Sequence, residues 1–168
     1  MRTGAYQKAI EGNRSQFQGK TVLDLGCGTG ILSLIACRAG AEKVYAVDAC
    51  EWAATMTRHN AKENGFQDKI EVLCGRIEDF DERAQKVDII VSEWMGYALL
   101  FESMLHSVSE YLKDKLLRQR IFDQVLHARD RWLKAEGCVL PDKARIFIAG
   151  ASEEALDTRS EERRVGKE

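Results

Sequence analysis

The sequence predicts an α/β fold built on a doubly wound, mostly parallel β-sheet. Short apolar runs alternate along the chain with longer segments of helical character, and this order is typical of a parallel sheet with helices on both faces. A glycine cluster at 26–30 follows the first such run, at the kind of turn where doubly wound sheets bind ligands. The 168 residues provide room for one domain with a sizeable core.

The elements of the first half are bounded by turn residues. Each strand is a short β-branched or leucine-rich run. The predicted strands are KTVLDL (20–25), KVYAVD (43–48), KIEVLC (69–74) and VDIIVS (87–92). A helix over 31–40 is stopped by Gly40, and a second helix over 51–64 is closed by Gly65.

The second half is predicted to continue with a long helical region from about Glu102 to Lys134. Gly137 is then expected to begin a last pair of strands, CVL and ARIFIAG, which Pro141 separates. The tail over 151–168 is rich in charge and has little apolar surface to bury, so we expect it to be disordered.

Composition narrows the class of protein. Hydrophobic residues make up 45% and charged residues 31%, as in ordinary soluble domains. A formal net charge of −2 argues against a nucleic-acid-binding surface but is compatible with a basic peptide partner. The five cysteines include no C-x-x-C pair, which favours free thiols in a reducing compartment. With no signal peptide and no membrane-spanning run, the sequence predicts an intracellular protein without direct membrane contact.

The glycine cluster has the spacing G-x-G-x-G, formed by Gly26, Gly28 and Gly30. This spacing differs from the dinucleotide fingerprint G-x-G-x-x-G, and no Lys-Ser or Lys-Thr follows as in a phosphate loop. Asp48 closes the second strand and could accept hydrogen bonds from both hydroxyls of a ribose. Asp24 would brace the loop or face a cationic group. The combination predicts an adenosine-containing ligand; the alternative is a tight structural turn with a solvated Asp48.

Two glutamates, Glu93 and Glu102, bracket an uncharged and aromatic stretch after the fourth strand. Carboxylates beside apolar residues are costly to desolvate unless a cation lies between them. The pair therefore indicates a site for a cationic group. The alternative is that each glutamate is a solvated residue near a helix start.

The segment VLDLGCGTG resembles the first motif of the class I S-adenosylmethionine-dependent methyltransferases, whose fold is Rossmann-like. More narrowly, the chain resembles a protein arginine methyltransferase, because SEWMGY followed by ESM is similar to the double-glutamate loop of that family. Further matches are MRTGAYQKAI, AGAEKVYAVDA, GRIEDF, VLHARDRWL and GCVLPDKARIFIA. The resemblance implies an S-adenosylmethionine-binding domain over residues 1–150.

That resemblance implies an enzyme that transfers a methyl group from S-adenosylmethionine to an arginine ω-nitrogen. Glu93 and Glu102 would grip the planar guanidinium by charge-assisted hydrogen bonds and leave the reacting nitrogen more nucleophilic. Tyr97 would help to exclude water. Met95 and Met104 would shape the pocket as in the type I branch, which makes asymmetric dimethylarginine. The alternative is that both methionines are plain core residues.

The resemblance also adds two cofactor contacts. Arg2 would meet the carboxylate of the methionine part of the cofactor, and Glu78 would lie near the adenine. Taken alone, an arginine beside the N-terminus is far more often solvated, and Glu78 could equally be one of several surface acids. The three histidines, His59, His106 and His127, show no metal spacing and no carboxylate partner, so we expect no metal site.

The chain departs from the family in three places. No segment matches the β-barrel domain, which carries the dimerisation arm of these homodimeric enzymes. Segment 109–124 is an insertion of about 4.4 helical turns, so a bulge, loop or excursion is expected to restore the helical phase. The alternative is that this segment is an unspliced or mis-predicted piece of the gene. The last residues, 159–168, resemble no part of the family and could be non-native.

The expected partners are arginine-containing proteins, such as Gly-Arg-rich segments or histone tails, in the cytoplasm or nucleus. Three rival functions remain at this point. A cofactor-binding or regulatory module without turnover fits the missing barrel. A nicotinamide-dependent oxidoreductase is disfavoured by the glycine spacing, and a small-molecule methyltransferase by the double-glutamate loop.

Overall fold

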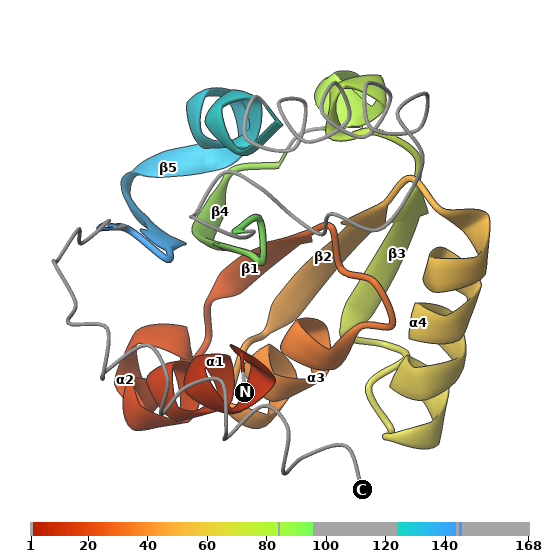
Figure 1. Cartoon of the computed structure of the whole chain (residues 1–168), viewed down its shortest axis with the longest axis horizontal. Helices are drawn as coiled ribbons and strands as arrows, with labels where there is room; N and C mark the ends of the chain where they lie inside the picture. The colour runs from red at the N-terminus through yellow and green to blue at the C-terminus, as the bar shows by residue number, and fades with distance from the viewer. Residues whose placement is uncertain (1, 84, 96–123, 144, 146–168) are drawn as a thin grey trace, which may run out of the picture.

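The computed structural model describes residues 2–83, 85–95, 124–143 and 145. Within them, a parallel sheet has the strand order β3-β2-β1-β4-β5 (Figure 1). The strands are β1 (Thr21–Leu25), β2 (Lys43–Asp48), β3 (Ile70–Cys74), β4 (Val87–Ser92) and β5 (Leu133–Leu140). The chain runs outward from β1 to β3 and then returns to the other side of β1. This is the predicted doubly wound α/β fold.

Helices cover both faces of this sheet, as predicted. The helical elements are α1 (Arg2–Gly12), α2 (Arg14–Phe17), α3 (Ile31–Arg38), α4 (Glu51–Glu63), the 3-10 helix η1 (Ile77–Arg83) and a helix over 124–132. The predicted helices 31–40 and 51–64 correspond to α3 and α4. In Figure 1, α1, α2 and α3 lie together on one side of the sheet, and η1 and helix 124–132 on the other.

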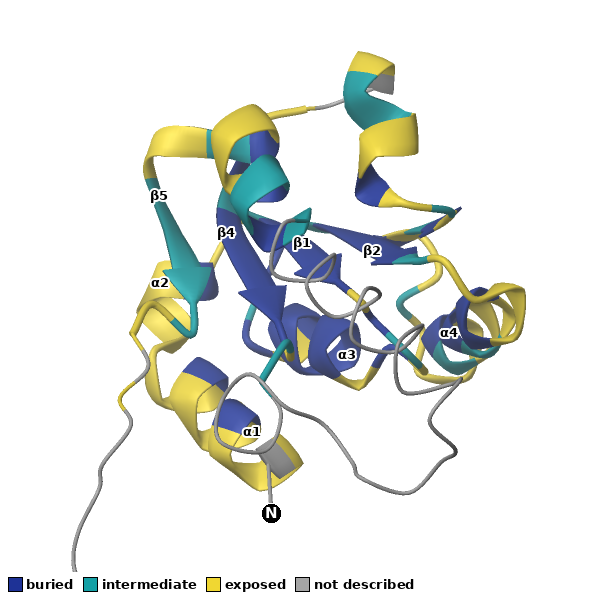
Figure 2. Ribbon diagram, turned by 45° about the horizontal axis from the view of Figure 1, so that its top comes forward, coloured by how far each residue is buried: buried dark blue, intermediate teal, exposed yellow. Residues whose placement is uncertain are grey.

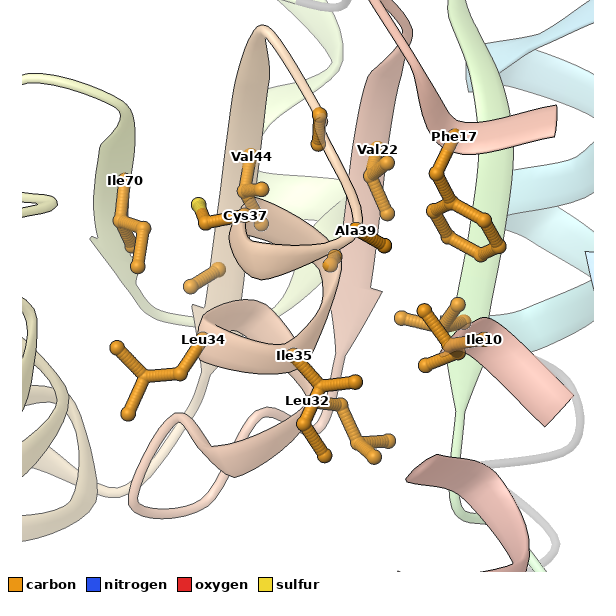
Figure 3. Close-up of a cluster of buried hydrophobic side chains, with 14 of the residues drawn as sticks. Ile10, Phe17, Val22, Leu32, Leu34, Ile35, Cys37, Ala39, Val44 and Ile70 are labelled. Atoms are coloured by element: carbon orange, nitrogen blue, oxygen red, sulfur yellow. The ribbon is translucent and has the colours of Figure 1, made fainter. Parts of the chain in front are cut away.

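The core is divided into two clusters because successive side chains of a strand point to opposite faces. On one face, the side chains of Ile10 and Phe17 lie beside α3 and belong to the same buried cluster (Figure 3). On the other face, Trp132 is fully buried and its ring meets that of Tyr45 edge-on, at 6.1 Å between centroids. Figure 2 shows β1, β2 and β4 buried between these layers, β5 partly exposed, and much of α1 and α4 exposed.

The start of the last strand differs from the prediction. Helix 124–132 ends at Trp132, and β5 begins directly at Leu133 rather than at Gly137. Gly137 lies inside the strand, where the register between β4 and β5 shifts. A Cβ at Gly137 would come within 2.8 Å of the Asp88 carbonyl oxygen, so glycine is required there by close backbone approach. This glycine marks a strand irregularity and not a strand start.

Several predictions lie outside the described residues: most of the helical region from Glu102, the insertion up to residue 123, nearly all of ARIFIAG and the tail over 151–168. The domain boundary near residue 150 therefore stays a prediction. Among the helices that are described, none is long and apolar enough to cross a membrane.

Candidate functional site

The strand register brings three predicted site positions into one row. Leu25 at the end of β1 pairs with Val47 of β2 on one side and with Ser92 of β4 on the other. The residues that follow these three are Gly26, Asp48 and Glu93. Because neighbouring strands lie about 4.8 Å apart, the glycine loop starts between the two acidic residues at the carboxyl edge of the sheet.

The three glycines of the loop have different reasons to be glycine. All have positive φ, at +72° for Gly26, +56° for Gly28 and +84° for Gly30. At Gly26 and Gly28 an added Cβ would meet nothing within 4 Å, so the bare backbone borders open space. At Gly30 the Cβ would lie 2.8 Å from Cγ2 of Thr57. Gly30 is thus required by packing, whereas Gly26 and Gly28 leave room for a ligand.

Two polar side chains of α4 donate hydrogen bonds to carbonyl oxygens of the glycine loop. Thr57 donates from Oγ1 to the carbonyl oxygen of Gly28 at 2.8 Å, and Asn60 donates from Nδ2 to that of Thr29 at 2.9 Å. Thr57 and Asn60 are three residues apart and therefore share a helix face. Neither residue is predicted from the sequence, because their spacing on α4 does not reveal which loop they contact.

Asp48 is bound to the same loop. Its Oδ2 accepts a hydrogen bond from the amide of Gly28 at 2.8 Å, and its Oδ1 accepts one from the amide of Cys50 at 2.8 Å. The carboxylate is therefore held by two backbone donors and is not simply solvated. Since each carboxylate oxygen can accept more than one hydrogen bond, Asp48 retains acceptor capacity for a ligand.

Asp24 lies one layer deeper. Its carboxyl group is fully buried in β1, and Oδ2 accepts a 2.6 Å hydrogen bond from Oγ of Ser33 on α3. Oδ1 has no hydrogen-bond partner among the described residues. Burial raises the pKa of Asp24 to about 6, and the hydrogen bonds of Ser33 oppose this rise. This geometry fits the bracing role predicted for Asp24, because it ties β1 to the helix that follows the loop.

Cys27 lies between the first two glycines but is buried. Desolvation raises the pKa of its thiol to about 12, and the nearby carboxylate of Asp24 adds to the rise. A thiol that stays protonated is a poor nucleophile. The structure therefore agrees with a Cys27 that takes no chemical part.

The segment 93–95 leaves the sheet with its side chains divided between three environments. Glu93 is exposed at the end of β4. Trp94 packs against the core cluster of Trp132, and Met95 packs against the opposite cluster, which contains Ile10. Partial burial of Met95 fits the alternative that it is a core residue. Glu102, Tyr97 and Met104 lie outside the described residues, so the glutamate pair stays a prediction.

The helix α1, which begins at Arg2, reaches the same edge of the sheet. The hydroxyl of Tyr6 donates a 2.8 Å hydrogen bond to the carbonyl oxygen of Ser92, directly before Glu93. The predicted contact of Arg2 with a cofactor therefore belongs to an element that is attached close to the site.

Beyond β3, Glu78 is exposed on η1, and Nε2 of Gln124 donates to its Oε2 at 3.5 Å.

The expectation that His127 has no carboxylate partner was wrong. Its Nε2 lies 2.8 Å from Oδ1 of Asp81, and this hydrogen bond is the main cause of the lowered pKa of Asp81. Partners 46 residues apart could not be matched from sequence. In the part of the chain that the structure describes, no group of His, Cys, Asp or Glu could hold a metal ion.

The chain matches one protein family and is similar to individual curated proteins. Residues 7–117 match the family described as ribosomal protein L11 methyltransferase (PrmA). The chain is 48% identical over 149 residues to a probable protein arginine N-methyltransferase 6.1 of Oryza sativa subsp. indica, covering 89% of this chain and 34% of that protein. It is 47% identical to protein arginine N-methyltransferase 1.1 of Arabidopsis thaliana, covering 88% and 33%. The chain thus spans about a third of these curated relatives.

Solved structures give the same result. The Trypanosoma brucei PRMT1 enzyme–prozyme heterotetrameric complex with AdoHcy is 42% identical, with a TM-score of 0.66 over 84% of this chain and 38% of that one. Arabidopsis thaliana protein arginine methyltransferase 10 is 44% identical, with a TM-score of 0.68 over 83% and 34%. The ribosomal protein L11 methylase of Lactobacillus delbrueckii subsp. bulgaricus, at 22% identity and a TM-score of 0.58 over 82% of this chain and 57% of that one, shares the fold alone.

Proposed function

We propose that this chain forms the cofactor-binding part of an enzyme that methylates protein arginine side chains. The chain belongs to the methyltransferase family described as ribosomal protein L11 methyltransferase (PrmA), and it is homologous to protein arginine N-methyltransferases. The arginine assignment rests on relatives of 44–48% identity. The observation that carries the proposal is the row formed by Asp48, Gly26 and Glu93 at one edge of the sheet.

S-adenosylmethionine is the proposed cofactor, and it would supply an activated methyl group on a sulfonium. One solved relative is described in complex with AdoHcy and another, PRMT6, with SAH. The residues of this chain fit such a ligand: Gly26 and Gly28 leave open space, and Asp48 has acceptor capacity for ribose hydroxyls. Arg2 and Glu78 would hold its carboxylate and adenine ends, while Asp24 and Gly30 would keep the loop in shape.

Glu93 and Glu102 would hold the guanidinium of the substrate. Arginine stays protonated at physiological pH, so two carboxylates can fix its planar fork by charge-assisted hydrogen bonds. They would also draw positive charge toward the nitrogens that they contact, which leaves the third nitrogen more nucleophilic. Holding the reactants in attack geometry can contribute about 7–11 kcal/mol in well-oriented systems.

Met95, Tyr97 and Met104 would line the acceptor pocket of a type I enzyme, with asymmetric dimethylarginine as product. The substrates would be Gly-Arg-rich segments or histone tails, met in the cytoplasm or nucleus.

Two measurements on the intact gene product test this function. A Gly-Arg-rich peptide is incubated with S-adenosylmethionine labelled in its methyl group, and cofactor binding is measured in parallel by calorimetry. Labelled methylarginine in the hydrolysed peptide is the expected result. Cofactor binding without transfer to any arginine peptide or histone tail would favour a regulatory module instead.

A further inference from the structure

Tyr6 connects the N-terminal helix to the exit of β4. Its hydroxyl donates a 2.8 Å hydrogen bond to the carbonyl oxygen of Ser92, across 86 residues of sequence. Both residues are buried, with 9% of Tyr6 and 1% of Ser92 exposed. A buried carbonyl needs a donor, so this contact specifies where α1 docks on the sheet.

Ser92 also makes a bond in the opposite direction. Its Oγ donates a 2.8 Å hydrogen bond to the carbonyl oxygen of Leu25, the last residue of β1. Gly26 follows Leu25 directly, so this bond fixes β4 to β1 at the point where the glycine loop begins. Through its carbonyl and its hydroxyl, Ser92 joins α1, β1 and β4 at one point.

The carbonyl of Ser92 shares a rigid peptide plane with the nitrogen and Cα of Glu93. A donor that holds this carbonyl therefore limits the rotation of the plane and the position from which the Glu93 side chain begins. The ring of Tyr6 packs in the core cluster of Ile10, which keeps its hydroxyl in place.

We propose that Tyr6 is a positioning residue for Glu93 and holds this carboxylate at a set distance from the glycine loop. The inference rests on the proposed function, in which Glu93 grips the arginine and the loop holds the methyl donor. Tyr6 itself contacts neither reactant. Its effect is exerted on turnover because small displacements of a catalytic group lower the rate far more than they lower binding.

The test compares Tyr6→Phe with a matched variant, Tyr45→Phe, in the intact protein. Tyr45 is also buried, and its hydroxyl donates a 2.8 Å hydrogen bond to Oε1 of Gln85, away from Glu93. Both variants lose one hydroxyl and keep the ring. For Tyr6→Phe we expect kcat for methyl transfer to fall about 3- to 10-fold, as for one lost hydrogen bond. Affinity for S-adenosylhomocysteine should stay unchanged, and Tyr45→Phe should keep the wild-type kcat.

Amide hydrogen exchange over residues 87–95 provides a second measurement, which does not depend on methyl-transfer activity. Exchange at the end of this segment should be faster in Tyr6→Phe than in wild type and Tyr45→Phe. Wild-type protein that transfers no methyl group would disprove the proposed function, and exchange alone would then decide the positioning role. The role is refuted if exchange in Tyr6→Phe equals that of wild type, or if an active wild type and both variants share one kcat.

Discussion

The amide of Gly28 donates a hydrogen bond to Oδ2 of Asp48 at 2.8 Å, so the glycine loop and the acid that ends β2 hold each other in place. In sequence they are 20 residues apart and resemble two separate signals. In the structure they are one unit, further tied to α4 through Thr57. A substitution at either position should therefore affect both the shape of the loop and the binding of a ligand.

Replacing Asp48 tests this unit. In Asp48→Asn, one carboxylate oxygen becomes an amide NH₂ that cannot accept from the backbone donors of Gly28 or Cys50. We expect the affinity for S-adenosylhomocysteine to fall roughly tenfold or more, as for the loss of hydrogen bonds to a charged group. Calorimetric titration measures the change. Asp68→Asn, at an exposed turn after α4, is the control. Equal affinities in the two variants would remove Asp48 from the ligand site.

Alanine at two glycines of the loop should have different consequences. Gly30→Ala combines positive φ with a Cβ 2.8 Å from Thr57, so we expect a loss of about 2–4 kcal/mol in the free energy of unfolding. Gly28→Ala carries only the backbone cost, about 1–2 kcal/mol, because nothing lies within 4 Å of its Cβ.

For ligand affinity, we expect the larger effect in Gly28→Ala and the smaller one in Gly30→Ala. The Cβ of Gly28→Ala would fill the space proposed for the cofactor and lower affinity roughly tenfold or more beyond its effect on stability. Urea unfolding and calorimetry on both variants provide the comparison. A Gly28→Ala protein with wild-type affinity would show that the open space beside this glycine is not used.

The limits of sequence-based prediction follow from the range of the interactions. The strands from β1 to β4 were predictable because each is a short apolar run bounded by local turn signals. Gly137 was misread as a strand start, since the approach of the Asp88 backbone that requires it comes from another strand. The contacts of Tyr6 with Ser92 and of His127 with Asp81 were missed for the same reason. A hydrogen bond between distant residues leaves no periodic trace in the sequence.

Asp24 should make stability depend on pH in an unusual direction. Burial raises its pKa from 3.8 to about 6, so between these values the folded state binds more protons than the unfolded state. The stabilisation from this group is therefore present at low pH and is lost as the pH rises through 6. Relative to Asp24→Asn, which does not titrate, wild type should gain about 1 kcal/mol in free energy of unfolding between pH 7.5 and pH 5.

Urea unfolding of wild type and Asp24→Asn at the two pH values measures this difference. Ser33→Ala supplies a second comparison, because it removes the 2.6 Å donor that opposes the pKa rise. In that variant the pH-dependent gain should be larger than in wild type. A pH-independent difference between wild type and Asp24→Asn would mean that the buried carboxyl keeps its ordinary pKa.

Glu93 is the described half of the proposed arginine clamp, and its charge can be removed with little change of shape. In Glu93→Gln the guanidinium loses one charge-assisted contact, so we expect kcat/KM for an arginine peptide to fall roughly 10- to 100-fold. Affinity for S-adenosylhomocysteine should change less than twofold (about 0.4 kcal/mol), because the glycine loop and Asp48 are untouched. Glu42→Gln, at an exposed turn before β2 and thus at the opposite edge of the sheet, controls for the loss of one negative charge. Radiolabelled methyl transfer by the intact protein is the measurement. If both variants transfer methyl groups at the same rate, Glu93 does not hold the substrate, and the row of Asp48, Gly26 and Glu93 serves cofactor binding alone.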